Sequence, residues 1–417
     1  MNNLPSLNLV AEQTRVLPAT GGTRVFWPHF NLAGVEKLLP TLLVLVVATD
    51  LQSIAAITPQ LARSLNTSAT SVSYSLVVYA AAAALVAALL RFSRRNFNSR
   101  LSLPLAACIY STACALTACS TGLISFLTAR ALTGLAGGLI SALAITALAQ
   151  ASGYDKRGRR MTLISVGYYL APLAGVPLSI WLAAQYGWRL VFAVTGLLAG
   201  AAAVLLRGVT RNFEAEVATS ASQPDHHRLS ISARLGIANA FFVSGGLIGF
   251  TAYLGTWLFE SLSAKPEKVG VVYALINAGA LAGGLLGGWL ADRFGKRSVV
   301  KQGTAAMLLG LLLMTTLALS TAMAEIMLVA IGLTVFAAAL RVAPLQALLT
   351  ELVAPKQRAS YIALRNLSSQ LGIGLGVLCC GRLYQIYSYA GVSAFCALLT
   401  AAAWLTIRAI REPETGT

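Results

Sequence analysis

Apolar segments long enough to cross a lipid bilayer recur along this chain; a helix needs about 20 apolar residues to do so. Backbone N–H and C=O groups in lipid must find partners within the protein, so only helices and closed barrels span a membrane. The segments are far longer than barrel strands of about ten residues and show no strict alternation. We therefore predict an all-α membrane protein with transmembrane helices at about 41–62, 71–91, 101–121, 122–150, 161–183, 188–207, 233–260, 267–290, 299–320, 324–351, 358–385 and 388–410.

The composition excludes a soluble protein of this size. Of the 417 residues, 57% are hydrophobic and 11% are charged, whereas soluble domains carry roughly a quarter charged residues. A polar stretch from Arg207 to Arg234 separates the sixth and seventh segments and is typical of a linker. We expect a cytoplasmic tail, a six-helix bundle, a cytoplasmic linker, a second six-helix bundle and a C-terminal tail at 1–37, 38–207, 208–232, 233–411 and 412–417.

The net charge of +17 is distributed unevenly among the loops. In a soluble protein it would suggest binding to nucleic acid, but here Lys and Arg cluster in alternate loops, which marks those loops as cytoplasmic. The clusters follow every second predicted helix and contain Arg91, Arg94, Arg95, Arg100, Lys156, Arg157, Arg159, Arg160, Arg207, Arg211, Arg228, Arg234, Arg293, Lys296, Arg297, Lys301, Lys356, Arg358, Arg408 and Arg411. We predict a multi-pass inner-membrane protein with both termini cytoplasmic and no nucleic-acid partner.

The sequence offers no sign of a cofactor, a metal or an enzyme. All six cysteines fall inside apolar segments, without metal or disulfide spacing, and are interpreted as small hydrophobic residues. No nucleophile constellation or phosphate-binding Gly-x-x-x-x-Gly-Lys-Ser/Thr loop occurs. The N-terminal tail lacks a charged region followed by an apolar one, so it is not interpreted as a cleaved signal peptide.

Two short basic hexads occupy equivalent loops of the two halves. Leu90–Arg95 follows the second predicted helix, and Asp292–Arg297 follows the eighth. Paired halves related by an axis along the membrane normal are an architecture of transporters, with the substrate site near the midplane between them. The repeat therefore favours a transport function.

The segment Gly287–Arg297 resembles the loop signature of the major facilitator superfamily, Gly-x-Leu-Ala-Asp-Arg-x-Gly-Arg/Lys-Arg/Lys. The resemblance implies a conformational role for Asp292, Arg293, Gly295 and Arg297, whose contacts break and reform as the halves move. In the first half Leu90 stands in place of the aspartate and Ser93 in place of the glycine. We therefore expect Asp292 to matter more to the conformational cycle than residues 91–95.

Two further segments resemble patterns of the same superfamily. Arg130 precedes the glycine-rich face formed by Gly134, Gly137 and Gly138, similar to the fourth-span pattern. Gly167–Val176 is similar to the antiporter motif Gly-x-x-x-Gly-Pro-x-x-Gly-Gly, in which Pro172 bends the helix and Gly175 allows close packing. The resemblance covers about residues 38–411 and implies two six-helix bundles of the 12-span drug:proton antiporter branch.

One acidic and three basic side chains lie deep in predicted spans, where ionisable residues are functional candidates. Asp50 is the acid, and with Arg130 it is our candidate for proton coupling, because a conformational change can alter a buried carboxylate's proton affinity. A purely structural ion pair is the alternative. Arg341 and Arg365 leave the interior with a positive balance, so we expect them to bind an anionic or zwitterionic substrate. Alternatively, Arg365 snorkels to the cytoplasmic face.

Other residues on spans that line the cavity of the resembled fold are candidate substrate contacts, although each alone is more typical of packing or of an interfacial belt. They are Gln52, Tyr79, Tyr168, Tyr253, Trp257, Asn277 and Gln346.

The function that these observations favour is proton-coupled export of a small organic molecule by a monomer in the lipid bilayer. The expected substrate is a carboxylate metabolite or a siderophore. Three alternatives stay open, namely a multidrug efflux antiporter for lipophilic compounds, a proton-coupled uptake symporter and a sensor of the same fold that does not transport.

Overall fold

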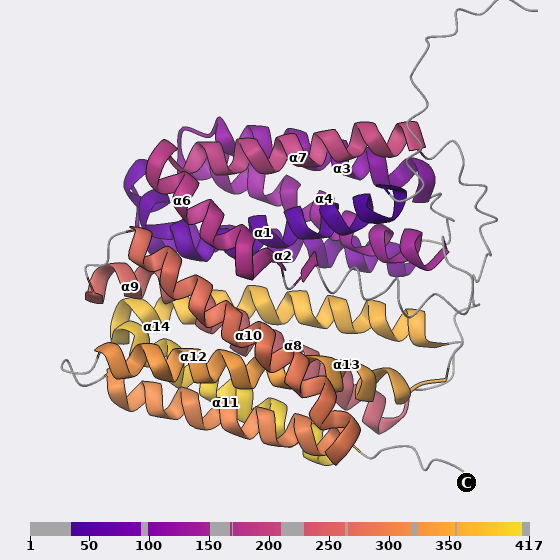
Figure 1. The fold of residues 1–417 in the computed structure, drawn as a ribbon, viewed down its shortest axis with the longest axis vertical. Coiled ribbons are helices and arrows are strands. Elements are labelled where there is room, and N and C mark those ends of the chain that lie inside the picture. The colour runs from indigo at the N-terminus through magenta and orange to yellow at the C-terminus, as the bar shows by residue number, and fades with distance from the viewer. Residues whose placement is uncertain are drawn as a thin grey trace, which may run out of the picture. The chain divides into compact units, whose positions relative to one another are not determined.

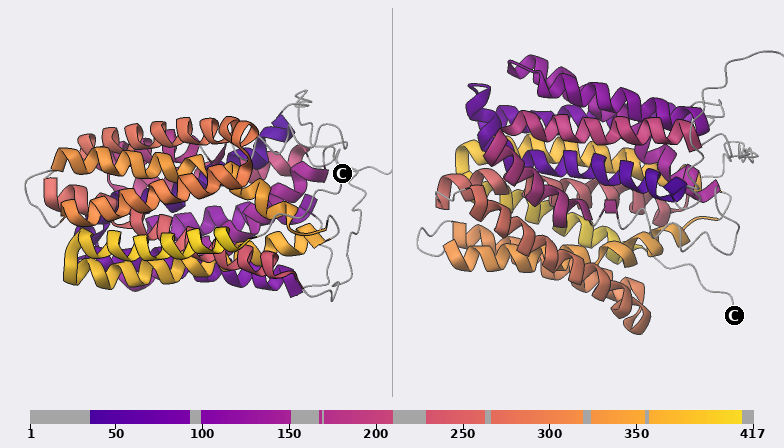
Figure 2. Two further views of the ribbon diagram at one scale, coloured as in Figure 1. Left: turned by 90° about the horizontal axis from the view of Figure 1, so that it is seen from below. Right: turned by 45° about the horizontal axis from the view of Figure 1, so that its top comes forward.

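A computed structural model describes residues 35–92, 99–150, 167–168, 170–209, 229–262, 266–318, 324–354 and 357–410. Residues 34–417 form one compact unit, and its described part is built of helices that run side by side (Figures 1 and 2). The predicted N-terminal tail 1–37 up to residue 34, the tail 412–417, most of the linker 208–232 and the basic loop at Lys156–Arg160 lie outside the described residues, so the domain boundaries stay predictions. Residues 35–37 already belong to the first helix.

The first half contains helices α1 (Val35–Ser64), α2 (Ala69–Phe92), α3 (Ser99–Ala118), α4 (Leu123–Gln150), the π-helical segment η2 (Ala171–Gly175), α6 (Val176–Tyr186) and α7 (Trp188–Val209). The second half contains α8 (Ile231–Ala252), α9 (Leu254–Leu262), α10 (Pro266–Phe294), α11 (Lys296–Ala318), α12 (Ala324–Leu340), α13 (Val342–Glu351) and α14 (Arg358–Ala409).

The predicted twelve-span architecture is confirmed. Within the described residues, nine helical segments are long and apolar enough to cross a membrane, and α3 is a shorter apolar helix. One of the nine runs from Ser360 to Ala409 and contains two spans, because Ser388 leaves helical geometry at φ 53° and ψ −147°. The fifth span is described from Gly167 onward and continues through η2 into α6.

Two spans that the sequence predicts as single helices are interrupted. The seventh span breaks at Tyr253, between α8 and α9, and the tenth breaks at Arg341, between α12 and α13. Pro344 accounts for the second break, because it has no N–H to donate to the carbonyl of Leu340 and its ring crowds that carbonyl. Arg341 is therefore placed at a helix junction, where its backbone carbonyl accepts from Leu345 at 2.9 Å.

The two halves are joined at one end of the bundle and have separate cores at the other. We call the end that carries Arg234, Arg293 and Arg408 the basic end. At the opposite end one hydrophobic cluster takes residues from both halves, among them Ile54 of α1 and Leu258 of α9. At the basic end each half has its own cluster, which is lined by Leu43, Tyr110 and Ile140 in the first half and by Val300, Leu349 and Ile407 in the second.

Helix α8 crosses α14 through glycines that bring the two backbones together. A Cβ built on Gly376 would lie 2.7 Å from the carbonyl oxygen of Gly245, and one built on Gly372 would lie 2.2 Å from that of Phe241. Small residues four positions apart are typical of such close crossings in membranes. The contact fixes the seventh span against the eleventh, next to the shared cluster.

We predict that Gly376→Ala lowers the melting temperature of the detergent-solubilised protein, because the new methyl group meets Gly245 backbone atoms. Gly374→Ala is the matched control in the same helix, since a Cβ on Gly374 would lie 3.8 Å from its nearest neighbour, the Cβ of Ala80. Exchange of Gly for Ala in a helix otherwise gains about 1 kcal/mol. Equal melting temperatures for the two variants would contradict the packing described.

Candidate functional site

Asp50 and Arg130 form an ion pair in the interior of the first half. The Nη1 atom of Arg130 donates to both carboxylate oxygens of Asp50, at 2.9 and 2.8 Å, and the hydroxyl of Tyr110 donates to Asp50 Oδ2 at 2.7 Å. All three side chains are 0% exposed. Three separate spans therefore contribute to one polar cluster, and its carboxylate already has a positive partner.

The rest of the Arg130 guanidinium faces aromatic rings. Its central carbon lies 5.3 Å from the ring centre of Tyr79 and 5.7 Å from that of Phe192. Its Nε and Nη2 atoms are buried and have no hydrogen-bond partner among the described residues. Cation–π contacts stabilise a desolvated guanidinium only in part, so Arg130 depends on Asp50 for its main compensation.

Glycines of the fourth and fifth spans press against this cluster. A Cβ on Gly137 would lie 2.3 Å from the Tyr79 hydroxyl, and a Cβ on Gly175 would lie 2.2 Å from Thr49 Oγ1, one residue before Asp50. Gly175 ends the π-helical segment that contains Pro172. The predicted irregularity in the fifth span is therefore present, and it lies directly against the residue that precedes the buried acid.

Arg341 and Arg365 are buried in the second half and have no carboxylate partner among the described residues. Arg341 is 1% exposed, and its guanidinium points toward α11, with Nη1 3.5 Å from Thr304 Oγ1 and Nη2 3.1 Å from Met307 Sδ. Arg365 is 7% exposed and lies 5.9 Å from the ring centre of Tyr361. Within the described part of the chain, the Nε atom of each has no hydrogen-bond partner.

The other predicted substrate contacts differ in exposure. Gln52 and Asn277 are half-buried, and Asn277 Nδ2 donates to the carbonyl of Tyr273 at 2.7 Å. Tyr168 and Gln346 are exposed, and Gln346 lies on α13. Their roles stay predictions.

Tyr253 and Trp257 lie inside the cluster that both halves share. The Tyr253 hydroxyl donates to the carbonyl of Val377 at 3.3 Å, and the Trp257 ring packs against Tyr389 with ring centres 5.4 Å apart. Contact of either side chain with a substrate requires the halves to separate at this end, and it stays a prediction.

The loop motif between α10 and α11 turns at Gly295, whose φ of 84° suits glycine. Asp292 and Arg293 are exposed, and Asp292 forms no ion pair within the described part of the chain. Arg297 Nη2 donates to the carbonyl of Arg408 at 2.9 Å. The corresponding loop of the first half, which begins at Leu90, lies outside the described residues from residue 93 onward.

Sequence reasoning missed two polar contacts. Tyr110 binds the carboxylate of Asp50, but nothing in the sequence distinguishes it from other tyrosines in apolar spans. Lys296 forms an ion pair with Glu351 across the basic end of the second half, and only the fold brings α11 and α13 together there. Within the described residues, no group of His, Cys, Asp and Glu side chains could hold a metal ion.

Comparison with known proteins places this geometry among membrane transport proteins. The family model for the Major Facilitator Superfamily matches residues 41–257 and 235–417. The uncharacterized MFS-type transporter YtbD of Bacillus subtilis is 27% identical over 142 residues, which are 33% of this chain and 35% of that protein. The inner membrane transport protein YdhP of Escherichia coli is 27% identical over 143 residues, 33% of this chain and 36% of that protein. The chain thus spans about a third of the length of these relatives.

Solved structures share the whole fold at low identity. The xylose transporter XylE from E. coli, in an inward-open conformation, has a TM-score of 0.72 and 19% identity and covers 91% of this chain and 97% of its own. The nucleoside transporter NupG has a TM-score of 0.68 and 14% identity and covers 91% of this chain and 100% of its own. At these identities the likeness concerns the fold alone.

We predict that Asp50→Asn destabilises the protein by about 3–5 kcal/mol, because it leaves the Arg130 charge buried without compensation. The double variant Asp50→Asn with Arg130→Met removes that charge as well and is expected to recover more than half of the loss. Thermal unfolding of the purified variants measures both effects. A double variant as unstable as the single one would show that the charge of Arg130 is not the source of the loss.

Proposed function

Because the chain belongs to the Major Facilitator Superfamily, we propose that it is a secondary active transporter, and that it exports a small organic anion or zwitterion in exchange for protons. The substrate class follows from the balance of deep charges, the coupling from the Asp50 cluster and the direction from the fifth span.

The unpaired arginines of the second half carry the proposal on substrate class. Asp50, the acid deep in the first half, is compensated by Arg130 at 2.8 Å, whereas Arg341 and Arg365 have no carboxylate partner among the described residues. Charges interact more strongly in a low-dielectric interior than in water, so two uncompensated guanidinium groups attract an anion. The same two charges would repel a lipophilic cation, which is the kind of substrate that a multidrug pump would carry.

The Asp50 cluster supports proton coupling. When Asp50 is ionised, Arg130 and Tyr110 hold it in place; a proton on Asp50 removes the charge that compensates Arg130. Because Asp50 is fully buried, it exchanges protons with water only in another conformation. Gly175 packs on the neighbouring Thr49, so a change at Asp50 is transmitted to the bend in the fifth span.

Export rests on the fifth span, Gly167–Val176, which resembles an antiporter motif; the shape of the two cores gives only the conformational state, which importers and exporters share. The halves share a core at the opposite end and have separate cores at the basic end, which corresponds to a state closed at the opposite end. With the basic end in the cytoplasm, as the distribution of Lys and Arg favours, a cytoplasmic substrate enters this state. The contacts of Lys296 with Glu351 and of Arg297 with Arg408 both lie within the second half, so the proposed conformational role of Gly295 and Arg297 acts on the packing of that half.

Uptake by proton symport would use the same cluster, and a sensor would need only binding. The Leu90 that replaces the loop aspartate of the first half favours the sensor, because that loop then lacks its usual acid. Reconstitution in proteoliposomes with an imposed pH gradient separates the three. Counterflow of protons and an acidic solute supports export, parallel flow supports symport, and binding without flux supports the sensor.

We predict that Arg341→Met and Arg365→Met each lower the flux of an acidic solute at least tenfold, because the field that attracts it is weakened. Each variant is also expected to melt at a higher temperature, since it removes an uncompensated buried charge. Arg382→Met, at an exposed position of the eleventh span, is the control and is expected to leave flux unchanged. Undiminished flux in both buried variants, or flux of cations alone, would contradict the proposed substrate class.

We also predict that Asp292→Asn slows transport at an unchanged protein level, because the exposed carboxylate acts in a conformation in which the loop contacts differ. Arg94→Gln, in the loop copy without an aspartate, is expected to have a smaller effect. Transport assays with protein levels matched by immunoblot compare the two. Intact transport in Asp292→Asn would remove the conformational role of this motif.

A further inference from the structure

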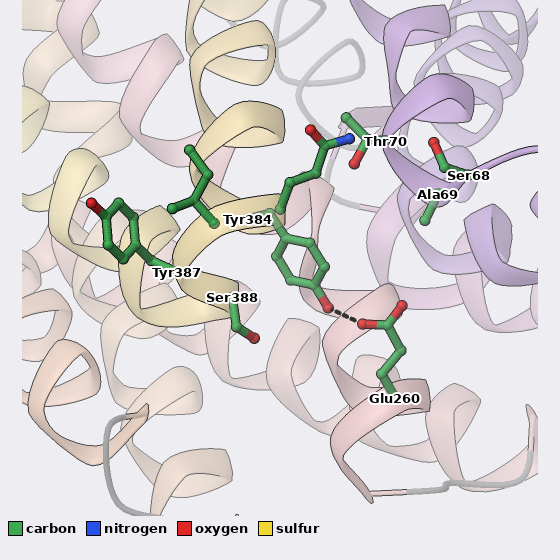
Figure 3. Close-up of a pocket in the computed structure, with 9 residues that line it drawn as sticks. Ser68, Ala69, Thr70, Glu260, Tyr384, Tyr387 and Ser388 are labelled. Atoms are coloured by element: carbon green, nitrogen blue, oxygen red, sulfur yellow. Dashed lines mark hydrogen bonds between the residues drawn. The ribbon is translucent and has the colours of Figure 1, made fainter.

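A pocket of about 640 Å³ lies at the opposite end of the bundle, outside the polar cluster of Asp50. It is bounded by segments of both halves (Figure 3): Ser68 and Thr70 at the start of α2, Glu260 near the end of α9, and Tyr384 to Ser388 in α14. Its volume is in the range of sites for small organic ligands. The proposed proton-coupling and substrate-binding residues Asp50, Arg130, Arg341 and Arg365 do not line this pocket.

The charge that faces the pocket is negative. Glu260 is the one carboxylate among its described lining residues, none of which is Lys, Arg or His, and this carboxylate accepts a hydrogen bond from the Tyr384 hydroxyl at 2.6 Å. Arg63, a basic residue at this end, lies instead over the Phe259 ring at 4.3 Å. The carboxylate therefore has no cationic partner among the described residues and stays open to a cation from solution.

An aromatic ring is fixed beside this carboxylate. Tyr384 stacks on Tyr253 with ring centres 5.2 Å apart and an angle of 23° between the planes, and its hydroxyl is held by Glu260 (Figure 3). A ring and a carboxylate held together are suited to an organic ammonium ion, because the ring face attracts the cation and the carboxylate pairs with it. An anion would be repelled at the same place.

Backbone strain is concentrated at the same pocket. Ser388, which lines it, has φ 53° and ψ −147°, a region that residues other than glycine rarely adopt. Such strain persists only where the surroundings hold it, and it gathers at ligand-binding and switch regions. The turn between the eleventh and twelfth spans is thus held in a costly conformation where it forms the pocket wall.

We propose that this pocket is a binding site for organic ammonium ions, with Glu260 as the counter-charge and Tyr384 as the aromatic wall. The two halves touch directly beside it, where a Cβ on Gly381 would lie 2.9 Å from Thr70. A cation bound between segments of both halves stabilises the arrangement closed at this end, because separation of the halves would disassemble its site. The site is therefore inhibitory.

Isothermal titration of the purified full-length protein with benzyltrimethylammonium tests the site, with benzyl alcohol and phenylacetate as neutral and anionic controls. We expect the cation alone to bind. Glu260→Gln should weaken binding at least tenfold, because it removes the charge and keeps an acceptor for Tyr384. Glu351→Gln, an exposed acid at the basic end, is the matched control and should change affinity less than twofold.

Tyr384→Phe removes the hydrogen bond to Glu260 but keeps the carboxylate. It therefore shows whether weaker binding in Glu260→Gln comes from loss of the charge or from a disturbed structure. It keeps the ring and frees Glu260, so affinity should stay within threefold of the parent protein. Absence of binding to the parent protein, equal binding of benzyl alcohol, or unchanged binding in Glu260→Gln would each overturn the site.

The inhibitory effect rests on the proposed transport function and has its own test. Benzyltrimethylammonium is a permanent cation, so in proteoliposomes of uniform protein orientation it can be confined to one side. Added on the side of Glu260 it should slow flux, and added on the other side it should not. Binding without slower flux would overturn the inhibitory role alone and leave the site in place.

Discussion

Compensation of the buried carboxylate of Asp50 is the constraint around which the first half is arranged. In the low-dielectric interior of a membrane protein an isolated charge is costly, and Asp50 is fully buried. Arg130 and Tyr110 each reach it from another span. The glycines of the fourth and fifth spans allow those helices close enough for the contacts to form. Protonation of the Asp50 carboxyl therefore removes the charge interaction that stabilises the packing of its own span against the spans of Tyr110 and Arg130.

The second half follows a different rule, because its deep charges are not compensated. Arg341 sits at the break that Pro344 introduces into the tenth span, and among the described residues its guanidinium contacts Thr304 and Met307 alone. A buried cation with such weak partners lowers stability, which fits the proposal that the charge of Arg341 serves to attract the substrate. The asymmetry between the halves divides the proposed mechanism, with proton handling in the first and attraction of the substrate in the second. The pocket at Glu260 lies apart from both and carries the opposite charge.

The sequence was sufficient for the fold and for the ionisable residues, and insufficient for their pairing. Span length and hydropathy are local properties, so the sequence predicts the twelve spans. It also predicts Asp50 and Arg130 as functional candidates, because a charged side chain inside a membrane span is costly. The contact of Tyr110 with Asp50 depends on how the third span is rotated, which an apolar segment does not encode locally. The same holds for Tyr253, whose place in the shared cluster follows from contact between halves. Pro344 indicates a break near Arg341 in the sequence itself, whereas no residue type indicates the break at Tyr253.

Export in exchange for protons through Asp50 requires that a proton on Asp50 and the substrate exclude each other. The most direct test is to add the acidic solute that the protein transports, as its salt adjusted to the same pH, to a weakly buffered solution of the purified protein and to record the pH against a blank without protein. Mutually exclusive binding predicts that protons are released, and that the release disappears in Asp50→Asn. Uptake of protons, or release that persists in Asp50→Asn, would contradict the account.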